Sequence, residues 1–352
     1  MDLPRGNQTN TSARIPWVRA LLVATALLAA ATVRADLPPP KPPLPSQSNP
    51  PSLVQPADCI IGQTCYIQNY VDADPGPAAR DFRCNPLSYD GHKGTDFAVP
   101  TLADMARDVA VLAAAPGRVR GVRDGMEDGA YLNDPNSVKE VECGNGLAIE
   151  HGHGWETQYC HLRKGSLLVK PGQEVTSGTP LGLIGQSGLA EFPHVHFALR
   201  FQGKPVDPYN PDRRDACAQP PEQTLWTGTP PAYIPGGVLL AGFAQRSPKL
   251  DVIGAGGGAA ETLPPDSPQI SLWGYLFGVR AGDEVVIEFA GPDNIYHKRT
   301  NKIDRNIAIL SRFSAKRRAG PAWPTGAYTG RVTLMRNGQS LDYKTATTFI
   351  SP

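Results

Sequence analysis

The sequence predicts an all-β protein with two domains built from antiparallel strands. Its 352 residues are enough for about two domains of roughly 100–200 residues each. Proline and glycine contribute 36 residues each, and aromatic residues only 7%. This composition favours short strands joined by many turns over long helices. The formal net charge of +1 argues against a nucleic-acid binder that relies on bulk electrostatics.

The N-terminus has the pattern of an export signal. Arg14 and Arg19 precede an apolar run over residues 20–33, and Val33–Arg34–Ala35 has the small-x-small pattern of a cleavage site. The run is about 14 residues long, shorter than the roughly 18–20 of a spanning helix. We therefore expect residues 1–35 to be a signal peptide. The mature protein would be exported, either periplasmic or secreted, without stable membrane insertion. An uncleaved anchor is the alternative.

Proline-rich stretches divide the rest of the chain. Residues 36–57 are expected to form an extended spacer without a core, and residues 219–236 a second connector. The first domain is then expected over residues 58–218 and the second over residues 237–352.

Six cysteines fit an exported protein, because an even number in an oxidising compartment favours disulfides. They are Cys59, Cys65, Cys84, Cys143, Cys160 and Cys217. Cys59 and Cys65 are the easiest local pair, and the full pairing stays open. A bridge at Cys160 would stiffen the neighbouring His161. The absence of a Cys-x-x-Cys motif disfavours a cysteine-ligated zinc site.

A hairpin is predicted in the middle of the first domain. Residues 144–151 form its first strand and residues 155–162 return as its second. Strict alternation along the second strand would place Thr157, Tyr159 and His161 on one face.

The stretch Pro193–Phe197 is the centre of the first domain's chemistry. As a strand, it places His194 and His196 on one face and Val195 and Phe197 on the other, which we expect to be buried. Two adjacent imidazoles are poor core material but good metal ligands. The alternative is two exposed histidines on a polar strand face.

Two further segments offer matching side chains. His92 and Asp96 stand on either side of a glycine, and His161 lies in the predicted hairpin. Together with the His194/His196 pair, they could supply two histidines and one aspartate to zinc and leave two histidines for acid–base work. A catalytic zinc usually has three protein ligands and an open position for water. The polar segment 124–142 is expected as a loop, either one wall of a groove or an inert insertion.

These motifs occur in an order that resembles a known family. They are His92-x-Gly-x-Asp96, Gly144–Asn145–Gly146, Ile149-x-His151–Gly152, Tyr159-x-His161–Leu162, the glycines 172, 182, 185 and 188, and Pro193–His194-x-His196–Phe197. The set is similar to the lysostaphin-type (LytM-like) zinc metallopeptidases, which are peptidoglycan endopeptidases, over about residues 80–210. The resemblance implies a small antiparallel β-domain with a long open groove. The long polar segment and the cysteines are less usual for that family.

The resemblance also implies roles for individual residues. His92, Asp96 and His196 would be the ligands of Zn²⁺, and His161 and His194 would line the water and substrate site. Some relatives that lack a ligand serve only as activators, whereas all five positions are present here.

The expected reaction is hydrolysis of peptide cross-links in peptidoglycan stem peptides by a zinc-activated water. His161 and His194 would position and deprotonate the water and return a proton to the leaving amine. Tyr159 is a candidate oxyanion or substrate contact. Two alternatives stay open, namely a secreted zinc protease of ordinary proteins and a non-catalytic zinc-binding activator of cell-wall hydrolases.

The last third of the chain is predicted to be a β-sandwich, because strand patterns recur there at short spacing. They cover residues 238–243, 270–279, 284–289, 326–335 and 343–350. Asn337–Gly338 is a strong hairpin signal. Both parities of 270–279 are apolar, which suits a strand covered on both faces. An immunoglobulin-like arrangement is one candidate, although its Cys…Trp…Cys pattern is absent.

Three roles stay open for this second domain: binding wall polymer, contacting a protein partner, or covering the catalytic groove. Trp273 and Trp323 could stack on sugars, but large aromatic side chains more often fill a core. His297 is expected in a polar loop.

Overall fold

The structure of the protein is a computed structural model that describes residues 49–212, 217 and 223–351. The expected signal peptide and most of the first spacer lie outside these residues. The prediction of an all-β fold is confirmed, since helices in the described part are short: α1 (Leu102–Met105), α2 (Ala130–Asn133), the 3₁₀ turn η1 (Pro135–Val138) and α3 (Leu250–Gly254). None of the described helices is long and apolar enough to cross a membrane.

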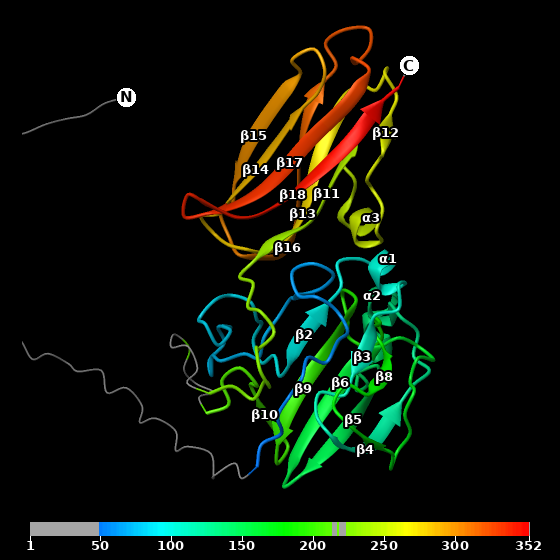
Figure 1. Ribbon diagram of the computed structural model, residues 1–352, viewed down its shortest axis with the longest axis vertical. Coiled ribbons are helices and arrows are strands. Elements are labelled where there is room, and N and C mark those ends of the chain that lie inside the picture. The colour runs from blue at the N-terminus through cyan, green and yellow to red at the C-terminus, as the bar shows by residue number, and fades with distance from the viewer. Residues whose placement is uncertain (1–48, 213–216, 218–222, 352) are drawn as a thin grey trace, which may run out of the picture. The chain divides into compact units, whose positions relative to one another are not determined.

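The first domain is built on an eight-stranded antiparallel sheet (Figure 1). Its order is β1 (Tyr66–Ile67), β2 (Thr95–Ala98), β9 (His194–Phe201), β6 (Trp155–Leu162), β5 (Asn145–Gly152), β4 (Gly117–Arg123) and β7 (Glu174–Val175), with β10 (Lys204–Val206) also paired to β9. A separate pair is formed by β3 (Ala110–Leu112) and β8 (Pro180–Leu183). The predicted hairpin is confirmed as β5 and β6.

The two faces of this sheet have different environments. Tyr159 pairs with Phe197, and both side chains lie in the hydrophobic core. The next pair along the strands, Cys160 and His196, therefore faces the opposite side. As predicted, Val195 is buried on the core face together with Phe197.

Two hollows lie on the outer face of the sheet. One is lined by residues of β4, β5 and β6, including Gln158, and the other adds Arg200 of β9. Gln158 and Arg200 lie on the same face as His196, because they alternate with core residues along their strands. This agrees with the open groove that the sequence predicts.

Part of each predicted spacer packs on the first domain, contrary to expectation. Leu53 forms a parallel β-bridge with Trp226, and both side chains are buried in the core of the first domain. Ala57 is buried there as well. The proline content of these stretches predicts an extended backbone. Isolated apolar side chains within them still stabilise the folded state when they are buried against the core.

A buried carboxyl group, Asp207, follows β10. Burial raises its pKa to about 7, and the nearby Asp81 adds to the rise although the backbone N–H of Tyr209 opposes it. The folded state thus holds this proton more tightly than the unfolded chain, whose aspartates titrate near 3.9. Stability contributed by protonated Asp207 is therefore present at low pH and lost as the pH rises from about 4 to about 7.

We expect Asp207→Asn to remove this pH dependence, because the asparagine amide does not titrate. Asparagine also keeps an oxygen to accept the Tyr209 N–H, which lies 2.8 Å from Asp207 Oδ1. Relative to the parent, the variant should gain stability between pH 5 and pH 8, by up to a few kcal/mol. Urea unfolding at both pH values measures the difference. An identical change in both proteins would contradict the prediction.

The second domain is a sandwich of two sheets. One has the order β11 (Gly237–Ala244), β13 (Gln269–Val279) and β16 (Ile307–Arg317). The other has the order β12 (Thr262–Leu263), β18 (Gln339–Ile350), β17 (Gly326–Arg336), β14 (Glu284–Ala290) and β15 (Tyr296–Lys302). The predicted hairpin around Asn337–Gly338 is confirmed as β17 and β18.

The strand β13 is buried on both faces, as its double apolar pattern predicts. Leu272 and Leu276 pack in the sandwich core, whereas Trp273 and Tyr275 pack on the other side against Ile253 of α3. Trp273 and Trp323 are both buried, so neither offers a free face to sugars. His297 lies in β15 and not in a loop, with Nε2 2.6 Å from Ser314 Oγ.

Candidate metal centre

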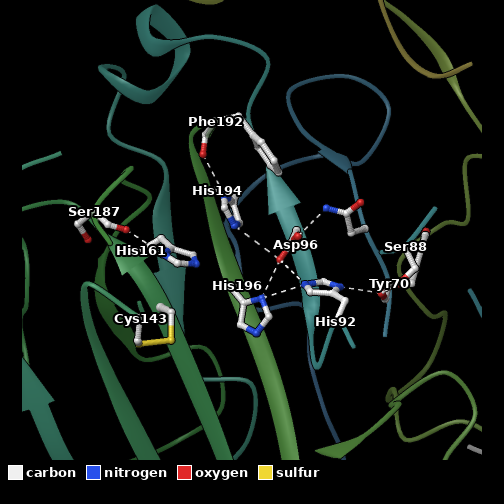
Figure 2. Close-up of polar contacts among 12 residues, drawn as sticks. Tyr70, Ser88, His92, Asp96, Cys143, His161, Ser187, Phe192, His194 and His196 are labelled. Atoms are coloured by element: carbon white, nitrogen blue, oxygen red, sulfur yellow. Dashed lines mark hydrogen bonds and ion pairs between the residues drawn. A yellow bond between two sulfur atoms is a disulfide. The ribbon is translucent and has the colours of Figure 1, made fainter. Parts of the chain in front are cut away.

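Three side chains bring one possible ligand atom each to a common point. Asp96 in β2 lies directly opposite His196 in β9, and His92 precedes β2 (Figure 2). Asp96 Oδ1 is 3.2 Å from His92 Nε2 and 2.9 Å from His196 Nδ1. The two histidine nitrogens are 3.1 Å apart. These three atoms could hold a metal ion.

Two outer hydrogen bonds orient this group. His92 Nδ1 donates to the Tyr70 carbonyl oxygen at 2.7 Å, which leaves the lone pair of Nε2 facing Asp96. Asn69 Nδ2 donates to Asp96 Oδ2 at 2.8 Å, so that Oδ1 turns toward the histidines. Such partners fix both the tautomer and the orientation of a metal ligand.

The electrostatics of the cluster favour a cation. Burial opposes charge on His92, but the Asp96 carboxylate outweighs it and raises the pKa of His92. Burial likewise opposes the charge of Asp96, yet His92 and His194 hold its pKa well below the usual range. Burial lowers the pKa of His196, although Asp96 opposes this effect. A buried carboxylate among imidazole nitrogens needs positive charge, which a proton or a metal ion can supply.

Gly94 is required by the packing of His196. A Cβ atom at this position would lie 2.6 Å from both Cε1 and Nε2 of His196. No larger residue fits between His92 and Asp96 without moving that ring.

His194 and His161 stand beside the three-residue group with their rings 4.7 Å apart (Figure 2). His194 Nδ1 donates to the Phe192 carbonyl oxygen, and His161 Nδ1 donates to the Ser187 carbonyl oxygen, both at 2.8 Å. In the neutral ring each Nε2 is then an acceptor. His194 Nε2 is 3.6 Å from Asp96 Oδ1.

Both histidines are held neutral by their surroundings. Burial lowers the pKa of His161 well below its usual value, and His194 and His196 add to the effect. Burial also lowers the pKa of His194, although Asp96 opposes the shift. A neutral imidazole whose Nε2 keeps its lone pair can accept a proton, which is the property of a general base.

The position of His161 depends on a break in the strand pattern. Its φ is +66°, in the left-handed region that few residues other than glycine adopt. The preceding Cys160 is tied to Cys143 by a disulfide, and the His161 N–H donates to the Cys143 carbonyl oxygen at 2.8 Å. This backbone turns the His161 side chain to the side of the sheet that carries His196.

Tyr159 therefore does not share a face with His161, and its predicted contact with substrate is wrong. Its side chain is fully buried. Its hydroxyl accepts hydrogen bonds from the Ala114 N–H at 2.8 Å and from Thr157 Oγ1 at 3.2 Å. The prediction assumes that the strand alternates regularly up to residue 161, but the left-handed backbone at His161 breaks this alternation.

The polar segment 124–142 supports His161 indirectly, through hydrogen bonds to the backbone of Gln186. Asp128 Oδ1 accepts from the Gln186 N–H at 2.6 Å, and the Gly129 N–H donates to the Gln186 carbonyl oxygen at 2.9 Å. Gln186 precedes Ser187, whose carbonyl orients His161. The segment is thus neither inert nor merely a wall, because it holds the backbone that carries this acceptor.

Three disulfides are formed, and no free cysteine remains in the described chain. The predicted Cys59–Cys65 pair is confirmed, and the other pairs are Cys84–Cys217 and Cys143–Cys160. Cysteine ligation of zinc is therefore excluded for these residues.

Several residues of the site escaped the sequence analysis. Asn69, and the backbone carbonyls of Tyr70, Ser187 and Phe192, act through contacts that no motif marks. Gly94 stands within the His92–Asp96 motif, but its steric role against the His196 ring is visible only in the structure.

The region that contains this site is similar in sequence to known proteins. The model of Peptidase family M23 matches residues 90–208. Peptidoglycan DD-endopeptidase ShyA of Vibrio cholerae is 34% identical over 116 residues, which are 33% of this chain and 22% of the relative. ShyB of the same organism, also a peptidoglycan DD-endopeptidase, is 36% identical over 121 residues, 34% of this chain and 23% of the relative. This chain thus covers less than a quarter of the length of either relative.

Among solved structures, the catalytic domain of the antimicrobial peptidase lysostaphin from Staphylococcus simulans is 21% identical, with a TM-score of 0.27. The match covers 40% of this chain and 85% of that domain. The ordered motif and the sequence matches together show that the chain contains a domain of Peptidase family M23 at residues 90–208.

Proposed function

We propose that this chain is an exported zinc metalloendopeptidase that hydrolyses peptide cross-links of peptidoglycan. The observation that carries the proposal is the meeting of three ligand atoms beside two histidines whose Nε2 atoms are free to accept a proton. The curated relatives named above support the substrate class.

His92 Nε2, Asp96 Oδ1 and His196 Nδ1 are the proposed zinc ligands. Ligands at roughly 2.0–2.2 Å from a tetrahedral zinc stand about 3.3–3.6 Å apart. The separations of 2.9–3.2 Å between these atoms are close to that spacing. Two imidazoles and one carboxylate are also a usual donor set for catalytic zinc, which leaves the fourth position open.

When bound, zinc supplies a Lewis acid that polarises the substrate carbonyl and lowers the pKa of water to about 7. The chain's own residues supply the proton transfers. One of the two rings, His161 or His194, accepts the single proton of the attacking water at Nε2, because each Nδ1 is committed to a backbone carbonyl. The protonated ring next stabilises the oxyanion and then gives its proton to the leaving amine. The products are one carboxyl and one amino end.

The substrate lies, in this proposal, along the outer face of the sheet. Gln158 and Arg200, which line the two hollows, lie on the same face of β6 and β9 as His196. An extended stem peptide can follow such a face, since its rise per residue is similar to that of a β-strand.

The test is digestion of purified peptidoglycan with the chain from Asp36 onward, followed by mass spectrometry of the fragments. We expect new amino and carboxyl ends within the cross-linked stem peptides, and their loss on zinc chelation with return on zinc addition. A denatured protein such as casein is the parallel substrate. Cleavage of casein alone would replace the proposal with a general protease. Zinc binding without cleavage of either would replace it with a non-catalytic activator.

A further inference from the structure

We propose that the C-terminal β-sandwich holds the general base His194 in place, with Phe192 as the positioning residue between them. The role of His194 as a base rests on the proposed function, whereas the contacts that hold its ring do not depend on that function. It assigns the sandwich a role in catalysis that differs from binding wall polymer or covering the groove.

Phe192 contacts His194 in two ways. Its carbonyl oxygen accepts the Nδ1 proton of His194 at 2.8 Å. Its ring stacks on the imidazole, with centroids 4.4 Å apart and an angle of 26° between the planes. The first contact fixes the tautomer and the second fixes the ring plane, so the direction of Nε2 follows from the position of Phe192 (Figure 2).

Phe192 and residues of the sandwich belong to one small apolar cluster. Phe192 and Ala98 of the first domain pack in one cluster with Phe277, Leu239 and Ile309 of the second. These three residues come from β13, β11 and β16, which form one sheet. Phe277 pairs with Ile309 across β13 and β16, so their side chains lie on one face of that sheet.

Other contacts hold the same edge of the first domain. The ring of Tyr66 in β1 lies 4.7 Å from that of Phe277, and Gln68 Nε2 donates to the Ala308 carbonyl oxygen at 3.3 Å. Tyr66 pairs with Ala98 of β2, the strand that carries Asp96. The sandwich is thus anchored beside β2 as well as at Phe192.

A further contact lies just beyond the same end of β2. A Cβ atom at Gly256, after α3, would lie 2.4 Å from Cβ of Ala103 in α1. The helix α1 begins just after β2 and is capped by Thr101. The two hollows of the sheet, in contrast, are lined only by residues 120–203. The contacts therefore support the site from its edge and leave those hollows free.

The variant that tests the link is Ile309→Ala, since Ile309 is half-buried and its truncation should leave the protein folded. We expect kcat for peptidoglycan cleavage to fall about tenfold with little change in KM and in zinc content, because small misplacements of a catalytic group cost rate and not binding. Phe313→Ala is the matched control. Phe313 lies four residues along the same strand and on the same face, but is exposed. Its kcat should stay within about twofold of the parent.

A double-mutant cycle separates positioning from general destabilisation. If Ile309 acts through Phe192, then adding Ile309→Ala to Phe192→Ala should lower kcat no further. Independent, multiplicative losses in the double variant would overturn the proposal. So would an Ile309→Ala variant with the kcat of the parent.

A readout without activity keeps the proposal distinct from the proposed function. The Nδ1 proton of His194, seen by ¹⁵N-edited NMR of the zinc-free protein, should be protected from exchange by its bond to Phe192. We expect Ile309→Ala, and not Phe313→Ala, to speed its exchange. If the parent cleaves no peptidoglycan but this difference is found, the proposed function fails and the positioning role stands. Equal exchange in all three proteins would overturn the positioning role.

Discussion

His161→Ala is expected to lower kcat for peptidoglycan cleavage by a factor of about 10²–10⁴ while the zinc content stays unchanged. His161 is not among the three proposed ligands, and its Nε2 is free because Nδ1 donates to Ser187. Removing it takes away a proton acceptor but no ligand. Zinc by atomic emission and kcat from fragment release measure the two effects separately.

His153→Asn is the control for this change. His153 lies in the exposed turn between β5 and β6, and asparagine tolerates its positive φ. Its kcat should equal that of the parent. If His161→Ala lost its zinc, or kept full activity, the separation between ligand and base proposed here would be wrong.

Asp96→Asn is expected to abolish both zinc binding and cleavage. The amide has nearly the shape of the carboxylate, but it removes the negative charge that faces His92 and His196. Because Asn69 donates to the outer oxygen, the replaced residue would keep its oxygen there and turn its NH₂ group toward the proposed metal position. The loss of zinc affinity should exceed the roughly 10–100-fold typical of changes in outer-shell partners.

Competition with a chromogenic chelator measures this affinity. Asp207→Asn serves as the matched variant, since it makes the same change at a buried carboxyl that does not belong to the three-residue group. It should bind zinc as the parent does. Equal zinc affinity of Asp96→Asn and the parent would exclude Asp96 as a ligand.

Much of the site followed from local rules. The alternation of a strand was enough to place His194 and His196 on one face and Val195 and Phe197 in the core. The spacing of His92 and Asp96 around a glycine allowed both to reach His196, and the structure adds that a side chain at residue 94 would strike that ring. The hairpin at Asn337–Gly338 was equally local, because the turn type limits the residues that can form it.

Other features depended on contacts between distant segments. Leu53 and Trp226 are nearly as buried as any core residue, yet their proline-rich surroundings predicted free spacers. Their partners lie far away in the sequence, and burial is a property of the folded chain as a whole. The same holds for Asn69, which reaches Asp96 across 27 positions.

By itself, the sequence determined the all-β class, the face of the His-x-His strand and the family of the domain, since each depends on residue order over a few positions. Tertiary structure alone decided that His161 turns to that face while Tyr159 enters the core. The disulfide at Cys160 and the hydrogen bond to Cys143 hold a left-handed backbone there, and strand alternation contains no information about it. Tertiary structure likewise brought Phe192 against the sandwich, because apolar side chains 47 to 117 positions apart meet only when both domains have folded.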